Sequence, residues 1–149
     1  MNITLINQRD QKWSSVKLGL SKVTVGSDGC LISDCCMAAS YWGVHLTPDL
    51  VAQHTESFDK NGEYLWNYPN FPFVLEKEIT GRNDTEIMKS LKDPNRAVVL
   101  QCDFGEHFVL GMSKNLFGSY KVADPWFGDT CDVVSRWKNI TGSRHLILK

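Results

Sequence analysis

The chain has 149 residues, of which 42% are hydrophobic, 11% aromatic and 22% charged. This length predicts a single domain over residues 1–149 that is large enough to bury a core. The formal net charge of −1 argues against a nucleic-acid partner, because binding to phosphates needs a basic face. It argues equally against a polybasic membrane anchor, and no apolar run approaches the ~18–20 residues that span a bilayer.

The first seven residues lack the charged and apolar regions of a secretory signal. We expect synthesis in the cytoplasm, and the compartment of action stays open. The five cysteines are an odd number, so they do not indicate a disulfide framework. Cys35 and Cys36 are adjacent, and their side chains diverge by about 100° on a helix, so we expect no structural zinc. No motif implies an organic cofactor.

Helical patterns lie in the first two thirds of the chain. The strongest runs from Cys30 to about Trp42, where apolar residues recur at helical spacing over a wide stripe, so we expect a central and largely buried helix. Thr47 and Pro48 open a second short helix as its N-cap and first residue. The remaining predictions are an irregular segment over residues 7–29, the end of the second helix near residue 54, an irregular aromatic-rich stretch over residues 55–75, and a third helix over residues 83–92.

Strand-like sequence dominates the last third. Residues 97–102, 107–112 and 118–124 are β-rich runs, and residues 131–137 and 143–148 are two further candidate strands. Helices that are followed by an antiparallel sheet predict an α+β fold.

A hairpin formed by the second and third β-rich runs would bring two polar residues together. If its turn is centred between residues 115 and 116, His107 lies opposite Asp124. Directly opposed side chains have Cβ atoms roughly 4.5–5.5 Å apart, so the carboxylate could hold one imidazole nitrogen while the other faces a nucleophile. The same register pairs Val109 with Val122 and Gly111 with Tyr120.

Cys30 is the candidate nucleophile. It lies in the first turn of the strongest helix, where free N–H groups and the helix dipole are expected to lower the pKa of a thiol. Its backbone N–H is a candidate oxyanion donor, and the side-chain amide of Gln8 or Gln11 could supply a second. Taken one at a time, these residues have ordinary structural alternatives, such as a buried cysteine or a solvated glutamine.

Several short motifs follow one another in a recognisable order. They are Gln8-x-Asp10-x-x-Trp13, Gly19, Thr24-x-Gly26-x-x-Gly29-Cys30, Gly43, Thr47-Pro48, His107-Phe108-Val109-Leu110 and Val122-Ala123-Asp124-Pro125-Trp126. Together, over about residues 5–128, they resemble the papain-like cysteine peptidases related to the bacteriocin-processing type, which cleaves double-glycine leaders.

The resemblance implies a papain-like α+β fold, in which a central helix carries the nucleophile and a twisted antiparallel sheet carries the histidine and the aspartate. It implies that Cys30 is the nucleophile, that His107 is the general base and later the acid, and that Asp124 orients His107. It also favours Gln8 over Gln11 as the oxyanion donor.

Two features depart from this family. Leu31 follows the cysteine, where relatives often carry a small residue. The bacteriocin-processing enzymes are usually fused to membrane transporters, and this sequence has no transporter segment. The chain therefore looks similar to stand-alone bacterial or bacteriophage domains, for which a cell-wall (peptidoglycan) peptide or a protein is the expected substrate.

Three functions stay open from the sequence. The leading hypothesis is a cysteine peptidase or amidase that hydrolyses a peptide-like bond through a Cys-His-Asp triad. The alternative is a catalytically inactive papain-like module with a binding or structural role, as a virion component or a partner-binding protein. Related acyl-transfer chemistry, such as transglutaminase or deamidase activity, is a third option, because the same triad serves all of them. The oligomeric state is not predicted.

Overall fold

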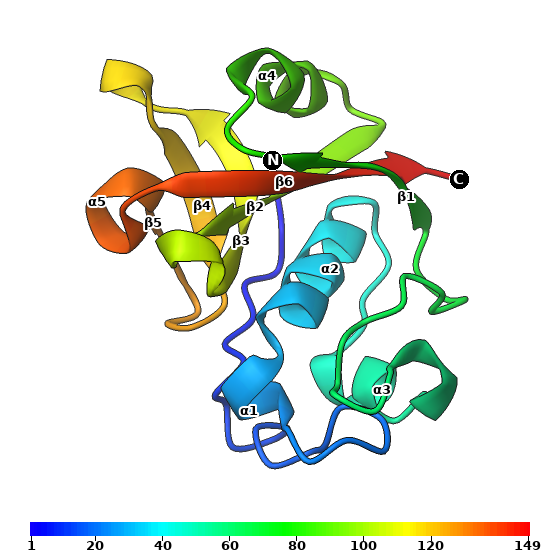
Figure 1. Ribbon diagram of the computed structural model, residues 1–149. Coiled ribbons are helices and arrows are strands. Elements are labelled where there is room, and N and C mark those ends of the chain that lie inside the picture. Colours follow the sequence, from blue (N-terminus) through cyan, green and yellow to red (C-terminus); the bar gives the residue numbers. More distant parts are fainter.

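The structure, a computed structural model, describes residues 1–149 and has an α+β fold built on a six-stranded antiparallel sheet (Figure 1). The strands are β1 (Phe73–Thr80), β2 (Arg96–Cys102), β3 (His107–Lys114), β4 (Tyr120–Asp124), β5 (Asp129–Asp132) and β6 (Ile140–Leu148), in the spatial order β1-β6-β2-β3-β4-β5. The helices are α1 (Val25–Asp28), α2 (Cys30–Tyr41), α3 (Pro48–Ala52), α4 (Asp84–Lys92) and α5 (Val133–Trp137), with short 3-10 turns η1 (Thr55–Ser57), η2 (Asp103–Gly105) and η3 (Leu116–Gly118). None of the helices is long and apolar enough to cross a membrane.

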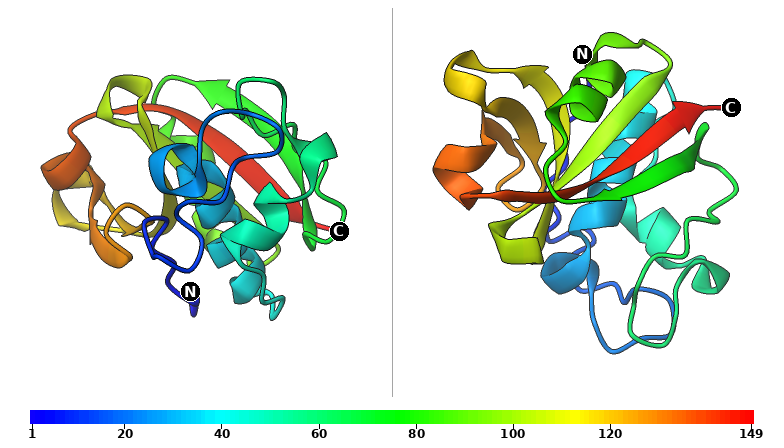
Figure 2. Two further views of the ribbon diagram at one scale, coloured as in Figure 1. Left: turned by 90° about the horizontal axis from the view of Figure 1, so that it is seen from below. Right: turned by 45° about the horizontal axis from the view of Figure 1, so that its top comes forward.

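Helices cover both faces of the sheet. Figure 1 shows α2 against one face and α4 against the other, and the further views in Figure 2 place α1 and α3 beyond α2, away from the sheet. In β2, Ala97 and Val99 pack in the core cluster that includes α2, whereas Val98 and Leu100 pack with α4. Consecutive strand residues point to opposite faces, so the uninterrupted apolar run of β2 fits a strand that is covered on both sides.

The long central helix begins where the sequence predicts it. Helix α2 starts at Cys30, and its interior is completely buried, as expected for the wide apolar stripe. It ends at Tyr41, and Gly43 follows in the left-handed conformation with φ 79°, which favours glycine. Gly29, just before the helix, lies so close to the carbonyl oxygen of Val25 that a Cβ atom there would collide with it. This close approach fixes the direction in which the chain enters α2.

The C-terminal region differs from the prediction of a strand over residues 131–137. Only Asp129–Asp132 form a strand, and α5 follows. The Asp132 side chain accepts a hydrogen bond from the Ser135 N–H and caps this helix, which outweighs the β preference of Val133 and Val134.

Three other elements, α1, η1 and β1, begin in stretches that were predicted to be irregular. Helix α1 interrupts the stretch 7–29. Strand β1 begins at Phe73, inside the stretch 55–75, and pairs only with β6 at an edge of the sheet. After the buried Phe73 its residues alternate between exposed and partly buried, because successive side chains point to opposite faces.

The register predicted for the β3–β4 hairpin is wrong by two residues. The structure pairs Gly111 with Val122 and Leu110 with Ala123, and a bulge lies between Gly111 and Ser113. The opposition of His107 and Asp124, and the pairs Val109 with Val122 and Gly111 with Tyr120, are therefore not formed. A shift of two residues keeps every side chain on its face of the sheet, so His107 and Asp124 become diagonal neighbours on the same face.

Candidate active site

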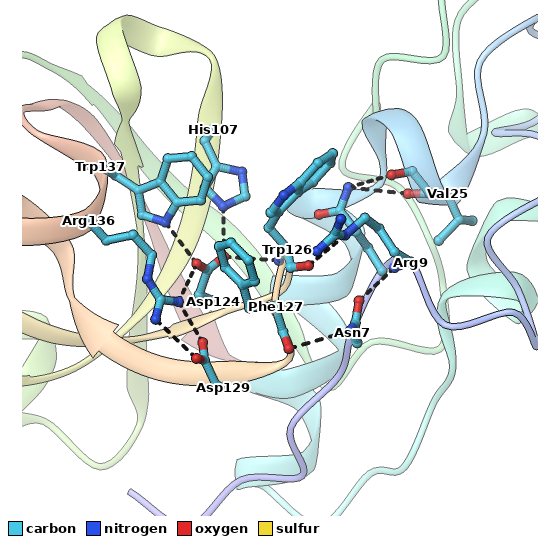
Figure 3. A network of polar contacts seen from close by, with 12 residues as sticks. Asn7, Arg9, Val25, His107, Asp124, Trp126, Phe127, Asp129, Arg136 and Trp137 are labelled. Carbon is cyan, nitrogen blue, oxygen red and sulfur yellow. Dashed lines mark hydrogen bonds and ion pairs between the residues drawn. The ribbon is translucent and has the colours of Figure 1, made fainter.

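His107 and Asp124 meet across the strands β3 and β4. Nε2 of His107 lies 2.9 Å from Oδ1 of Asp124 (Figure 3), and both side chains are buried. Because the carboxylate engages Nε2, it leaves Nδ1 as the ring nitrogen without a hydrogen-bond partner in the chain. A fixed imidazole with one free nitrogen is the arrangement that a general base requires.

Asp124 is the centre of a hydrogen-bond network. Besides His107, its oxygens accept bonds from the Trp126 backbone N–H (2.9 Å), the Arg136 guanidinium (2.9 Å) and the Trp137 indole N–H (2.8 Å). Burial alone would raise the pKa of this carboxyl. The hydrogen bonds from His107, Arg136 and Trp137 outweigh burial and hold the pKa of Asp124 below its usual value. Asp124 is therefore kept as a carboxylate beside the imidazole.

Helix α5 supplies two site residues that the sequence analysis did not identify. The Trp137 ring packs on the His107 ring with centroids 4.3 Å apart. Arg136 also forms two hydrogen bonds with Asp129, at 2.6 and 3.0 Å. No spacing in the sequence points to Arg136 and Trp137 as site residues. Their segment was predicted as a strand, and it reaches the site only through tertiary packing.

The N-terminal segment is held against the loop that follows β4. The guanidinium of Arg9 lies 4.4 Å from the centre of a Trp126 ring, and its Nε donates to the Trp126 carbonyl oxygen at 2.8 Å (Figure 3). The backbone N–H of Gln8 donates to the Pro125 carbonyl oxygen at 2.8 Å. These contacts bring the segment that carries Gln8 to the histidine side of the site.

Cys30 lies at the N-terminus of α2 and is partly exposed. Its backbone N–H donates to no backbone carbonyl, as expected for the first turn of a helix. Helix α2 packs against β3, and the backbone of Phe108, the residue after His107, is near enough to the sulfur to lower the pKa of the thiol. The thiol is thus next to the strand that carries the imidazole.

The expected lowering of the Cys30 pKa is contradicted. Burial of the sulfur and the negative charge of Asp34 raise the pKa of this thiol to about 12, and the backbone groups of Phe108, Leu31 and Cys30 itself offset only part of the rise. Asp34 is itself completely buried, and neither carboxyl oxygen has a partner. Burial and the charge of Asp124 raise the pKa of Asp34 well above its usual value.

A cavity of about 890 Å³ brings three of the four predicted site residues together. Gln8, Cys30 and His107 all line it, and Asp124 lies behind His107. The other three histidines do not line it: His45 is exposed, His54 bonds to Ser57 (2.8 Å), and His145 is buried between Ser90 (2.7 Å) and Ser143 (2.9 Å).

Gln8 is the glutamine that reaches the cavity, whereas Gln11 is exposed and does not line it. Nε2 of Gln8 donates to the Gly26 carbonyl oxygen at 3.1 Å and makes a longer contact of 3.4 Å to that of Val25, which fixes the orientation of the amide. Its Oε1 is buried and has no partner. Donation to an oxyanion therefore requires Nε2 to give up the longer contact.

These groups suit acyl transfer by a thiol: a sulfur at a helix N-terminus, an imidazole with one free nitrogen, and a carboxylate that holds the other. No group of three or more His, Cys, Asp or Glu residues is placed to hold a metal ion. Comparisons of the chain with protein-family models, with curated proteins and with solved structures found no match.

Proposed function

We propose that the protein is a papain-like cysteine peptidase or amidase that hydrolyses a peptide-like bond. The observation that carries this proposal is the hydrogen-bonded pair of His107 and Asp124 at the wall of the cavity that Cys30 also lines. The cavity volume of about 890 Å³ lies within the range of roughly 300–1,000 Å³ in which proteins hold small ligands. A peptide segment of a protein or of peptidoglycan is the proposed substrate.

The first half of the reaction transfers the acyl group to sulfur. The raised thiol pKa means that Cys30 rests as a neutral thiol, so proton transfer to Nδ1 of His107 accompanies the attack of Sγ on the substrate carbonyl. The C–S bond forms, and the backbone N–H of Cys30, which no backbone carbonyl accepts, is the donor for the developing oxyanion. Asp124 stabilises the imidazolium that results.

The second half returns the protein to its starting state. The imidazolium of His107 donates its proton to the leaving amine as the C–N bond breaks, which leaves a thioester on Cys30. His107 then takes a proton from water, the hydroxide attacks the thioester carbonyl, and the sulfur leaves and is reprotonated. One water is consumed, and an acid and an amine are released.

The raised thiol pKa also favours the second candidate, an inactive module that keeps this fold for binding. The two candidates differ in turnover. We would assay fluorescence-quenched peptide libraries and purified peptidoglycan with the wild type, with Cys30→Ala and with Cys131→Ala, a matched control because Cys131 is also partly exposed. The proposal predicts cleavage that Cys30→Ala abolishes and Cys131→Ala retains. Unchanged turnover in Cys30→Ala, or no cleavage by the wild type, would contradict it.

A further inference from the structure

We propose that the cavity selects peptides with a cationic side chain, lysine or arginine, beside the bond that is cut. This inference rests on the proposed function and names its substrate class. It is drawn from the charged and aromatic groups that line the cavity and from one buried acceptor that has no partner.

The charged lining of the cavity is almost entirely acidic. Arg144 is the only lysine or arginine there, and it is engaged: it forms an ion pair with Glu78 at 2.8 Å, and its guanidinium lies 5.3 Å from the centre of the Phe108 ring. The acidic residues that line the cavity are Asp28, Glu63, Glu78, Asp103 and Glu106. Apart from Glu78, none of them forms an ion pair within the chain.

The four unpaired carboxylates flank the reactive groups from three parts of the chain. Asp28 ends α1, two residues before Cys30. Asp103 and Glu106 lie in and after the η2 turn, directly before His107. Glu63 comes from the loop just before Tyr64. Like charges that line a concave site reinforce one another and raise the local concentration of the opposite charge, so this cavity attracts cations to the thiol.

A second observation points to a ligand with a donor. Gln8 lines the cavity and is only 1% exposed, and its Oε1 is buried and has no hydrogen-bond partner. A buried acceptor without a partner is costly, and a substrate N–H or ammonium would satisfy it. The carboxylates of the cavity and the unpaired Oε1 of Gln8 therefore both favour a positively charged hydrogen-bond donor.

Aromatic side chains complete the match to a long cationic residue. Tyr64 and Trp66 line the cavity together with the carboxylates, as do Trp126, which already contacts Arg9, and Trp137, which packs on His107. Aromatic faces bind ammonium and guanidinium groups through cation–π contacts and pack against the methylene stem of lysine or arginine. A glutamate at the same substrate position would meet like charge and is rejected.

The sign of the potential at the thiol can be measured without turnover. In a Cys131→Ser background, Cys30 is the only cysteine that is not buried. We would compare its rates with the cationic (2-trimethylammonio)ethyl and the anionic 2-sulfonatoethyl methanethiosulfonates. With each reagent the thiolate forms a mixed disulfide and releases methanesulfinate. The ratio of the two rates is divided by the same ratio for 2-mercaptoethanol.

We expect a normalised ratio on the order of 10 in favour of the cation at low salt. It should fall toward 1 at about 1 M salt, where the Debye length is only about 3 Å. Glu63→Gln/Glu106→Gln should lower it several-fold, whereas Glu56→Gln, at an exposed carboxylate outside the cavity, should leave it unchanged. A ratio of 1 or less at low salt would overturn the inference.

Peptide cleavage separates this inference from the proposed function. We would use fluorogenic peptides that differ only in lysine, norleucine or glutamate at one position. The kcat/KM should be about tenfold higher for lysine than for norleucine, and Glu63→Gln/Glu106→Gln should reduce this ratio. Cleavage without a charge preference refutes the inference and leaves the function standing. If no peptide is cleaved, the function fails, and the inference is then decided by whether the lysine peptide binds more tightly, as followed by tryptophan fluorescence.

Discussion

Replacing Asp124 by asparagine tests the hydrogen-bond network that holds the imidazole. In the wild type the carboxylate accepts four bonds, from His107, Trp126, Arg136 and Trp137, all between 2.8 and 2.9 Å. Asparagine keeps one oxygen for the first two donors but turns an NH₂ group toward the other two. Bonds to a charged acceptor are each worth about 1.5–3 kcal/mol, so the loss of two predicts that the free energy of unfolding falls by about 3–6 kcal/mol.

The stabilisation that Asp124 provides should depend on pH in a direction set by its pKa. The folded pKa of Asp124 is lowered, so its contribution to stability is present above the unfolded value of about 3.9 and is lost as the pH falls through the folded value. The difference between wild type and Asp124→Asn should therefore be largest near neutral pH and shrink below about pH 4. Urea unfolding followed by tryptophan fluorescence measures it, with equal m-values as the check on two-state behaviour.

The control for this experiment is Asp129→Asn. Asp129 shares Arg136 with Asp124, but its side chain is 46% exposed and does not touch the imidazole. We expect a loss under about 1 kcal/mol. A loss of less than about 1 kcal/mol in Asp124→Asn, or a gap that does not change with pH, would refute the network as described.

Trp137→Phe removes the indole donor but keeps a ring on the imidazole, and we expect urea unfolding to show a loss of about 1–2 kcal/mol; an unchanged stability would contradict the role of that bond. Asp34→Asn should become more stable relative to wild type as the pH rises above about 4. The reason is that the raised pKa of Asp34 makes the folded wild type hold a proton that the unfolded chain releases. A difference in unfolding free energy between the two proteins that is the same from pH 4 to 8 would contradict this. Gly29→Ala should cost about 1–3 kcal/mol in urea unfolding, because its Cβ meets the Val25 carbonyl oxygen; a neutral substitution would show that the backbone yields there. Alkylation of Cys30 by iodoacetamide, mapped by mass spectrometry, should rise about tenfold per pH unit between about pH 7 and 9 because the thiol pKa is about 12; a plateau in that range would show a lowered pKa.

Local sequence signals predicted the elements that local interactions specify. The start of α2 at Cys30 and the capping of α4, where the Asn83 side chain accepts from the Glu86 N–H, depend on residues within one turn. The strands β2 and β3 each contain a run of apolar residues, and they form within one or two residues of their predicted bounds. These elements were enough to predict the α+β class.

The errors lie where tertiary contacts decide. The β3–β4 register depends on the bulge after Gly111, which no residue pattern announces. The sequence around Val133 favours a strand, yet the Asp132 cap and the bonds of Arg136 and Trp137 to Asp124 fit a helix.

The pKa of Cys30 is the clearest case of a property set by packing. The helix N-terminus was expected to lower it, but burial of the sulfur and Asp34, one helical turn away, raise it. Burial cannot be deduced from the position of a residue in its own helix. The acidic lining of the cavity could not be predicted from the sequence either. Its carboxylates come from separate parts of the chain that only the fold brings together.

The most direct test of the proposed site is covalent trapping of its nucleophile. Wild type and His107→Ala would be incubated with a lysine-containing peptidyl vinyl sulfone, to which a thiolate adds while a proton is delivered to the neighbouring carbon. Mass spectrometry would locate the adduct, and circular dichroism would confirm that both proteins are folded. We predict an adduct at Cys30 alone, formed about 100-fold more slowly in His107→Ala. An adduct at another cysteine, or equal rates in the two proteins, would contradict a catalytic role for Cys30 and His107.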